Sequence, residues 1–489
     1  MYPNFLIRFC TLCGVMMLTA CTLGPDFVPP KAPETVHYNR GEDLKKTVSV
    51  EGVSQRFEAG VAPVAYWWKL YHSDELDRAV AEGVANNPTL EAAQASLRLS
   101  YDNLQAGYGI FYPQASLDVA ADRQKFSPAR FGSNAPGPIF NLVTLSASVS
   151  YALDVFGGEH RLIENLQSQL DGQRAIVLGT YLALTGNIVN TTVAMAAYRD
   201  EIMHTKQLIT LQKEEIATAE KQVKAGTVSY ASVLALHSQL ASLEASLPPL
   251  RQRLIQSEHL LATLAGHAPS EWQPPEISLN TFMLPGKLPL SLPSELVRQR
   301  PDILAAEAGL HGASANIGVA TAAQFPSLTL NATFGQNGTS MNNLLGSNGN
   351  FWSIGPDIVT PLFNGGTLAA RKQGAIDAYK QSQALYRQTV ISAFSQVADT
   401  LNALEYDAQM LLAQSQALQT SEESLHLAQT SYQAGTISYQ QVLAADIQYH
   451  QAKIYYLQAE AQRFQDTTAL FVAMGGGAGT ETVLGAGAH

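Results

Sequence analysis

The chain repeats one structural pattern in its two halves. Pro88 opens a helical pattern in the first half, and Pro301 opens a similar one in the second. The segment Ala225–Tyr230 returns as Ala434–Tyr439, at nearly the same spacing. A register that is kept through helix, strand and helix indicates that a whole structural unit has been duplicated. Each unit is therefore expected to be half of a larger arrangement.

The N-terminus has the pattern of a secretion signal. Arg8 supplies a positive charge, and the apolar stretch 9–18 is shorter than the ~20 residues that a membrane-spanning helix needs. Leu18-Thr19-Ala20-Cys21 then matches a bacterial lipobox, in which the cysteine is lipidated, for example with palmitate, and becomes the first residue. The alternative is ordinary cleavage after Ala20 beside a chance cysteine. Thr22 in place of an aspartate points to the outer membrane.

The cysteine count limits the chemistry of the mature chain. Cys10 and Cys13 lie in the predicted signal peptide, residues 1–20, and Cys21 carries the lipid. The mature chain then has no thiol for a disulfide, a metal site or a nucleophile. No later segment reaches about 18 consecutive apolar residues, so we expect no membrane-spanning helix after the signal.

The composition argues against several classes of function. A net charge of −11 disfavours nucleic acid, because phosphate binding needs a basic surface. An acidic lumen that favours cations and a merely solvated acidic surface both remain compatible with this charge. Histidines are scattered, without zinc-type spacing, and no phosphate loop or Gly-x-Ser-x-Gly motif is present. We therefore predict no enzyme activity, no catalytic residues, no metal site and no cofactor.

Composition and periodicity divide the chain into successive segments. They are a signal peptide (1–20), an extended tether (21–65), repeat one (66–265), a proline-rich linker or equatorial segment (266–293), repeat two (294–475) and a C-terminal tail (476–489).

Each repeat is predicted to contain two strands. Apolar and small polar residues alternate in Leu145–Tyr151 and in Leu328–Phe334, which is the pattern of a sheet with two different faces. Loops rich in Gly, Pro, Asn and Ser connect the two strands of each repeat. The predicted strands cover about 114–126, 142–155, 327–336 and 351–362.

Long helices follow the strands in both repeats. The stretch from Glu159 to Lys224 has no proline, which corresponds to on the order of 100 Å of helix. Each long helix is expected to end at an Ala-Gly-Thr sequence, where glycine is a natural C-cap, and a second helix returns from Tyr230 or Tyr439. Two such antiparallel helices predict a coiled-coil hairpin in each repeat.

Four strands cannot close a barrel, and an open sheet edge is forbidden in lipid. If the strands span a membrane, several copies of the chain must share one barrel. Three copies supply twelve strands and leave a lumen, whereas eight strands from two copies would be largely filled by side chains. Transport therefore favours a trimer, while a soluble sandwich remains the alternative for such short strands.

Several motifs together make the chain resemble the outer-membrane factor family, the TolC-like channels of tripartite efflux pumps. The resemblance is strongest to the OprM-like or NodT-like lipoprotein branch and covers Trp67 to about Gly476. The motifs that carry it are the lipobox at Cys21, Asn87-Pro88-Thr89-Leu90, Phe111-Tyr112-Pro113, Asp154-Val155-Phe156-Gly157, the string from Leu292 to Ile303, Ala305-Ala306-Glu307, Phe325-Pro326 and Pro361-Leu362-Phe363-Asn364-Gly365-Gly366.

The resemblance implies a mainly α protein with β strands, assembled as a homotrimer. Four strands per chain would form a twelve-stranded barrel in the outer membrane, continued by a helical periplasmic tunnel with a small equatorial α/β region. The protein would be a passive, gated conduit that is anchored by lipid at Cys21. Its partners would be a periplasmic adaptor (membrane fusion protein) and an inner-membrane RND-type pump.

The resemblance also assigns the periplasmic end. The two Ala-Gly-Thr turns correspond to the tips where adaptor hairpins dock: Ala225, Gly226, Thr227, Ala434, Gly435 and Thr436. The residues expected near the gate are Tyr230, Ser232, Tyr439, Gln441, Ala444 and Asp446. Many relatives carry carboxylates at the positions of Gln441 and Ala444, so this chain is expected to have a weaker, less cation-sensitive gate that closes through hydrogen bonds of Tyr230, Tyr439 and Gln441.

Two other functions remain open at this stage. An outer-membrane factor could instead serve type I protein secretion, because the pump selects the cargo. A coiled-coil spacer lipoprotein without a pore is the third reading, although a spacer needs no alternating strands in both repeats.

Overall fold

The computed structural model describes residues 22–132, 135–344, 346 and 348–477. The predicted signal peptide, Cys21 and nearly all of the predicted tail lie outside these residues. The chain forms two compact units, which we describe separately. Unit 1 contains Arg98–Gly172, Ala306–Tyr386 and the described part of Met1–Pro29, and unit 2 contains Pro30–Leu97, Gln173–Ala305 and the described part of Arg387–His489.

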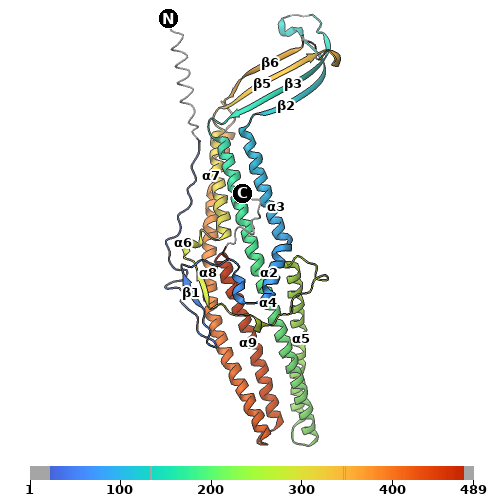
Figure 1. Cartoon of the computed structure of the whole chain (residues 1–489), viewed down its shortest axis with the longest axis vertical. Coiled ribbons are helices and arrows are strands. Elements are labelled where there is room, and N and C mark those ends of the chain that lie inside the picture. Colours follow the sequence, from blue (N-terminus) through green and yellow to red (C-terminus); the bar gives the residue numbers. More distant parts are fainter. Residues whose placement is uncertain (1–21, 133–134, 345, 347, 478–489) are drawn as a thin grey trace. The chain divides into compact units, whose positions relative to one another are not determined.

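A four-stranded antiparallel sheet dominates unit 1 (Figure 1). Its strands, in spatial order, are β2 (Gln114–Lys125), β3 (Ile139–Leu153), β5 (Ser327–Gly338) and β6 (Asn350–Val359). Each repeat contributes one hairpin, and the pairing of β3 with β5 joins the two repeats. Within the described residues, the outer edges of β2 and β6 have no strand partner.

The helices that precede the strands begin alike in both repeats. Helix α3 (Pro88–Tyr108) and helix α7 (Pro301–Ala322) each start with proline, whose missing N–H leaves no hydrogen bond unmade in the first turn. The Asn87 side chain caps α3 by accepting hydrogen bonds from the backbone N–H groups of Thr89 and Leu90. Both helices contribute residues to both units.

The long helices have the same lengths in the two repeats. Helices α4 (Gly158–Lys224) and α8 (Thr367–Gln433) have 67 residues each, and the returning helices α5 (Tyr230–Leu264) and α9 (Tyr439–Ala473) have 35 each. The register of the duplication thus holds through both hairpins. One difference was not expected from the sequence analysis: α5 continues through two consecutive prolines, at 248 and 249.

Helix α4 qualifies the expectation that no membrane-spanning helix follows the signal. By length and composition alone, it contains an apolar window long enough to cross a membrane. Half of that window is buried inside the protein, as in the core helix of a bundle. The prediction from consecutive apolar residues overlooked it because isolated polar residues interrupt the apolar stretch.

A small α/β region in unit 2 contains segments that the sequence analysis described as tether and linker. Strand β1 (Arg56–Ala59) pairs in parallel with β4 (Lys287–Leu290). Unit 2 also contains the helices α2 (Asp74–Asn86) and α6 (Pro293–Leu296) and the 3-10 helices η1 (Trp67–Tyr71) and η4 (Leu279–Thr281). The 3-10 helices η2 (Gly109–Phe111), η3 (Pro128–Phe131) and η5 (Met341–Asn343) belong to unit 1.

Buried aromatic and arginine side chains hold this region against α9. Trp67 is fully buried, and its ring stacks on Phe471 with the centroids 5.1 Å apart. Arg463, also buried, donates from Nε to Gln55 (3.1 Å). Arg300 donates to the carbonyl of Ala473 (2.9 Å), which satisfies an acceptor in the last turn of α9.

Candidate functional site

The cross-strand register sorts the sheet of unit 1 into an apolar face and a polar face. Two neighbouring apolar rows run across all four strands: Leu117, Ala147, Phe334 and Trp352, then Ala115, Val149, Ala332 and Ile354. Two polar or small rows alternate with them: Ser116, Ser148, Thr333 and Ser353, then Gln114, Ser150, Asn331 and Gly355. On the apolar face, Phe334 is 57% exposed and Trp352 is 71% exposed, so large apolar side chains face outward.

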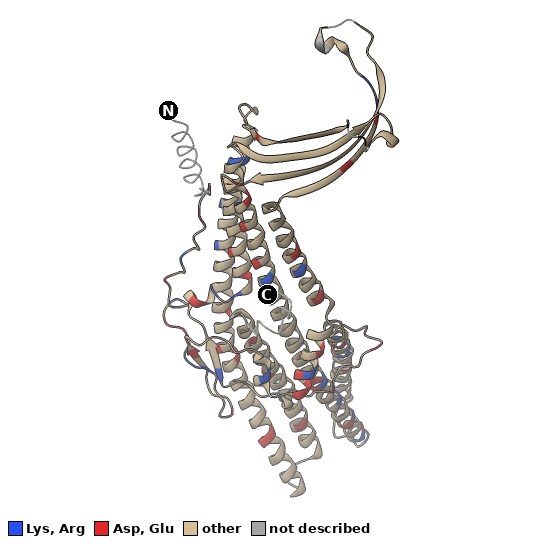
Figure 2. Cartoon of the chain, turned by 45° about the horizontal axis from the view of Figure 1, so that its top comes forward, with Lys and Arg blue, Asp and Glu red and all other residues tan. Residues whose placement is uncertain are grey.

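Few charged side chains lie on this sheet, whereas the helices carry more of them (Figure 2). On the polar face, Ser116 and Ser148 hydrogen-bond through their hydroxyls (2.8 Å), and Thr144 donates to Asn337 (2.9 Å). This combination of an apolar face, a polar face and two open edges matches the alternation of a membrane β-barrel wall.

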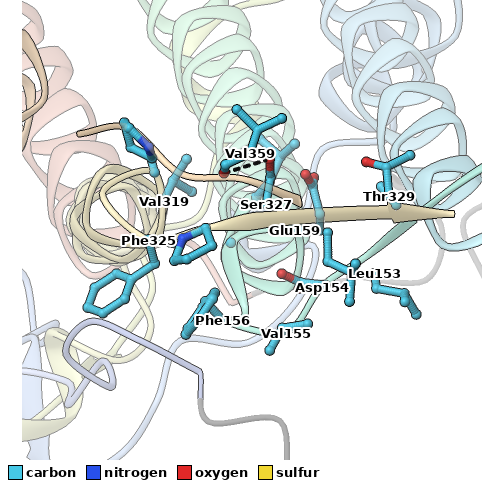
Figure 3. Close-up of a pocket in the computed structure, with 18 of the residues that line it drawn as sticks. Leu153, Asp154, Val155, Phe156, Glu159, Val319, Phe325, Ser327, Thr329 and Val359 are labelled. Atoms are coloured by element: carbon cyan, nitrogen blue, oxygen red, sulfur yellow. Dashed lines mark hydrogen bonds between the residues drawn. The ribbon is translucent and has the colours of Figure 1, made fainter. Parts of the chain in front are cut away.

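An apolar cleft of about 540 Å³ lies in unit 1 where the strands meet the helices. Phe156 and Phe325 line it with their ring centroids 5.0 Å apart, next to Leu153 and Val359 (Figure 3). The N-terminal segment reaches this cleft, because the backbone N–H of Leu23 donates to the carbonyl of Phe156 (3.1 Å).

A cluster of charges holds the N-terminal segment against the helices of unit 1. The Arg161 side chain, only 7% exposed, pairs with Asp26 (2.6 Å) and Glu164 (2.7 Å). Glu164 also contacts Nε2 of His311 (2.8 Å), and the His311 ring stacks on Phe27 with the centroids 4.3 Å apart. The Arg161 side chain is buried whereas Asp26 is exposed, so these contacts, together with the Phe27–His311 stack, attach the segment after Cys21 to the surface of the helices.

The two Ala-Gly-Thr turns have the same backbone structure. Thr227 N–H donates to Gln222 O, and Gly226, at φ +73°, donates to Val223 O. Thr436, Gly435 (φ +75°), Ser431 and Tyr432 repeat both bonds in the second hairpin. These are Schellman caps, which need the left-handed conformation that glycine adopts easily. Neither glycine would bring an added Cβ within 4 Å of another atom, so both tips are open to a partner.

The predicted gate residues are not all brought together. Tyr439 Oη donates to Glu214 Oε2 (3.1 Å) and thereby joins α9 to α4. Gln441 instead caps its own helix by accepting from the backbone N–H of Ser438 (3.3 Å). Ser232 contacts the N-cap residue Ser229 at the equivalent place in α5, with the hydroxyls 3.1 Å apart. Tyr230 is 65% exposed.

The two remaining gate candidates lie next along α9. Ala444 is exposed and lines an open groove together with α8 residues such as Ala417 and Thr420. Asp446 is half-buried, and burial raises the pKa of its carboxyl group. Its Oδ1 atom lies 3.5 Å from Nε2 of His450.

The sequence analysis missed three residues of the α4–α9 contact: Glu214, His204 and His450. It described the histidines as scattered and without zinc-type spacing, but His204 and His450 face each other with their Nδ1 atoms 3.0 Å apart. A buried apolar cluster of Leu208, Leu211, Leu443, Ile447 and Ile454 lies along the same contact. No local signal in the sequence pairs positions that belong to different repeats.

A pair of carboxyl groups joins α8 to α9 in unit 2. Burial, together with a hydrogen bond to Asp466 and that group's charge, raises the pKa of Asp407 to about 8, against a smaller lowering by Arg463. Nearby on α9, burial raises the pKa of Glu460 to about 7. These acids are therefore partly protonated near neutral pH.

The chain is similar in sequence to known outer-membrane proteins. The sequence profile of the family described as "Outer membrane efflux protein" matches residues 80–267 and 292–476. The chain is 28% identical over 411 residues to Nodulation protein T of Rhizobium leguminosarum bv. viciae, covering 83% of this chain and 80% of that protein.

Two further relatives are channel or efflux proteins. The probable efflux pump outer membrane protein TtgC of Pseudomonas putida is 27% identical over 413 residues, covering 83% of this chain and 82% of that protein. The solved structure of the outer-membrane channel OprN has a TM-score of 0.81 and 25% identity, covering 94% of this chain and 99% of that chain.

Proposed function

Because this chain belongs to the outer membrane efflux protein family, we propose that it is the outer-membrane channel of a tripartite efflux pump. It would be a passive, gated conduit without enzyme activity. A periplasmic adaptor and an inner-membrane RND-type pump would deliver the exported substrate to it, and the pump would supply the energy.

The observation that carries this proposal is the sheet of unit 1. It has one apolar and one polar face, and both outer edges, β2 and β6, are unpaired within the described chain. A membrane forbids such edges, so if the strands span one, other copies of the chain would close the sheet. Three copies would pair β6 of one protomer with β2 of the next and give twelve strands, with the Ser116 row toward the lumen and the Trp352 row toward lipid.

The periplasmic end would supply the gate. The exposed tips at Gly226 and Gly435 would receive the adaptor, and the Tyr439–Glu214 bond would hold α9 against α4 in the closed state. Adaptor binding would favour the open state by contributing more binding free energy to it than to the closed state. Since Gln441 and Ala444 carry no charge, a ring of carboxylates is absent there, and we expect weak block by hard cations such as Mg²⁺.

Lipidation of Cys21 would anchor each protomer to the outer membrane. The Arg161 cluster holds Asp26 and Phe27, and Leu23 contacts Phe156 beside the apolar cleft. The lipid would therefore enter the bilayer at the end of the strands. One acyl chain alone binds a membrane only marginally, so the anchor would supplement the barrel in sorting and would not carry conduction.

Single-channel recording in planar bilayers, with the native mass determined alongside, tests this proposal. We expect a trimer with small, rarely open currents, and more frequent opening when Tyr439 is changed to Phe. A monomer without conductance that becomes soluble once its lipid is removed would overturn the proposal in favour of the coiled-coil spacer.

A further inference from the structure

Two histidines from different repeats meet on the seam between α4 and α9 in unit 2. The Nδ1 atoms of His204 and His450 lie 3.0 Å apart, and the ring planes are tilted by 43°. The buried side chains of Leu208 and Ile447 pack on the same seam. Two ring nitrogens at this distance need one proton between them, since two lone pairs would repel each other.

The distance between the two nitrogens is also that of two ligands on one metal ion. A Zn–N bond is about 2.0–2.1 Å, so two imidazoles at an angle between square and tetrahedral place their nitrogens about 2.9–3.4 Å apart. His204 and His450 therefore need little movement to bind an ion in place of the shared proton.

The surroundings favour neutral imidazoles and direct the Nδ1 lone pair of His450 to this point. Asp446 Oδ1 lies 3.5 Å from Nε2 of His450, which favours the proton on Nε2 and leaves Nδ1 free as a ligand. Burial lowers the pKa of both histidines; Lys453 on the facing helix lowers that of His204 further, whereas Asp446 on the same helix raises that of His450. The charged groups that act on the pair are Asp200 of α4 and Asp446 and Lys453 of α9, and the Tyr449 ring packs against His450.

We propose that His204 and His450 form a binding site for one divalent transition-metal ion of the imidazole-preferring class, such as Zn²⁺ or Cu²⁺. Among the described residues, no group of three or more His, Cys, Asp or Glu side chains has metal-binding geometry, so water would complete the coordination sphere. Nitrogen ligands select such ions over Mg²⁺ and Ca²⁺, which prefer oxygen.

A bound ion would cross-link α4 to α9 about three helical turns from the Tyr439–Glu214 bond. If α9 moves away from α4 when the channel opens, the ion would hold the channel closed. This regulatory consequence rests on the proposed gating function, whereas the binding site itself rests on the geometry of the two histidines alone.

Zinc titration of the chelator-treated full chain by calorimetry tests the site. We expect one Zn²⁺ per protomer, and a loss of affinity of at least about tenfold in both His204→Asn and His450→Asn. His426→Asn, on the exposed face of α8, is the matched control and should bind as the unsubstituted chain does. Equal native mass and melting temperature would establish that the variants are folded.

The result that overturns the site is zinc binding that neither His204→Asn nor His450→Asn weakens, or no binding at all. Single-channel recording with added Zn²⁺ then tests the regulation. Fewer openings in the unsubstituted channel, with no such response in His450→Asn, would support it. Zinc binding at the two histidines without any effect on opening would reject the regulatory consequence and keep the site, while a non-conducting protein would reject the proposed function.

Discussion

The two helical hairpins (Figure 1) have the same lengths and the same tips, but their returning helices differ in burial. Helix α9 has fifteen buried residues and α5 has three. Equivalent leucines illustrate this: Leu443 of α9 is 1% exposed, whereas Leu234 of α5 is 52% exposed. Duplication thus preserved the local structure of the hairpin while the packing of its two copies diverged.

Sequence differences between α5 and α9 agree with this difference in packing. The position of buried Leu457 in α9 is occupied in α5 by Pro248, and that of Gln458, which donates to Glu201 (3.0 Å), by Pro249. Proline inside a helix removes a backbone hydrogen bond and disfavours straight packing. Helix α9 therefore packs more extensively on its own chain than α5, which is joined to α4 by ion pairs of partly exposed side chains, Lys213–Glu244 (2.8 Å) and Arg199–Glu258 (2.9 Å).

The largest expected effect comes from truncating the equivalent leucines. Leu443→Ala should destabilise unit 2 by about 2–5 kcal/mol, because it leaves a cavity in the α4–α9 cluster. Leu234→Ala should change the stability by less than about 0.5 kcal/mol, as an exposed position does. Thermal unfolding of both variants would measure the contrast, and equal losses would mean that another copy of the chain buries Leu234 in the assembly.

A pH-dependent difference is expected next, because only the second hairpin carries the Asp407–Asp466 pair. The folded pKa of Asp407, about 8, exceeds its ordinary value of 3.8, so the folded state holds a proton that the unfolded state releases between these values. Stability should therefore fall as the pH rises from about 4 to about 8, by up to about 1.4 kcal/mol per pH unit.

Asp407→Asn should remove this part of the pH dependence and stabilise the protein above neutral pH. Unfolding midpoints measured across that pH range would check it. The equivalent residues of the first hairpin, Tyr198 and Ser257, cannot form such a pair, so Ser257→Ala is the control. An unchanged pH profile in Asp407→Asn would show that Asp407 is ionised in the folded protein at neutral pH.

The two equivalent tyrosines should differ by a smaller amount. Tyr439→Phe loses the bond to Glu214 and should weaken the closed state by about 1 kcal/mol, which is roughly a fivefold higher open-to-closed ratio. Tyr230→Phe should raise this ratio less, because Tyr230 is exposed in its own chain and would have its equivalent partner only in a neighbouring protomer. Open probability in single-channel records would separate the two, and equal effects would remove the asymmetry between the hairpins from the gating mechanism.

The last prediction concerns the pair of residues equivalent to Tyr439 and Glu214. It involves the smallest change in stability and tests the assembly most directly. In the register of the two hairpins, Tyr230 corresponds to Tyr439 and Glu423 to Glu214. If three copies surround one axis, Tyr230 of one protomer should approach Glu423 of its neighbour. A Tyr and a Glu side chain that meet end to end hold their Cα atoms farther apart than the ~7 Å that a direct disulfide allows. Tyr230→Cys combined with Glu423→Cys should therefore be joined between protomers by a bis-maleimide reagent, in a chain whose described residues contain no cysteine, and a denaturing gel would detect the cross-linked dimer.

The elements were readable from the sequence where a local pattern specifies them. Strict alternation placed β3 and β5, and absence of proline with glycine caps placed α4, α8 and both tips. The same reasoning described 21–65 and 266–293 as tether and linker, although Arg56–Ala59 and Lys287–Leu290 form a parallel pair. Strands this short, whose partner lies in a distant part of the sequence, carry too little local pattern to be recognised.

Side-chain contacts between distant helices could not be predicted from local sequence patterns, for a different reason. Tyr439 was a gate candidate from the family resemblance, but its contact with Glu214, and that of His204 with His450, depend on how α4 and α9 are rotated about their axes. Periodicity identifies the apolar face of each helix, but it does not show which two faces pack together. Duplication, helix length, strand alternation and turn chemistry follow from short-range sterics and hydrogen bonding written in the chain. The choice of α9 over its near copy α5 as the buried arm arises from side-chain packing between helices, which exists only once the chain has folded.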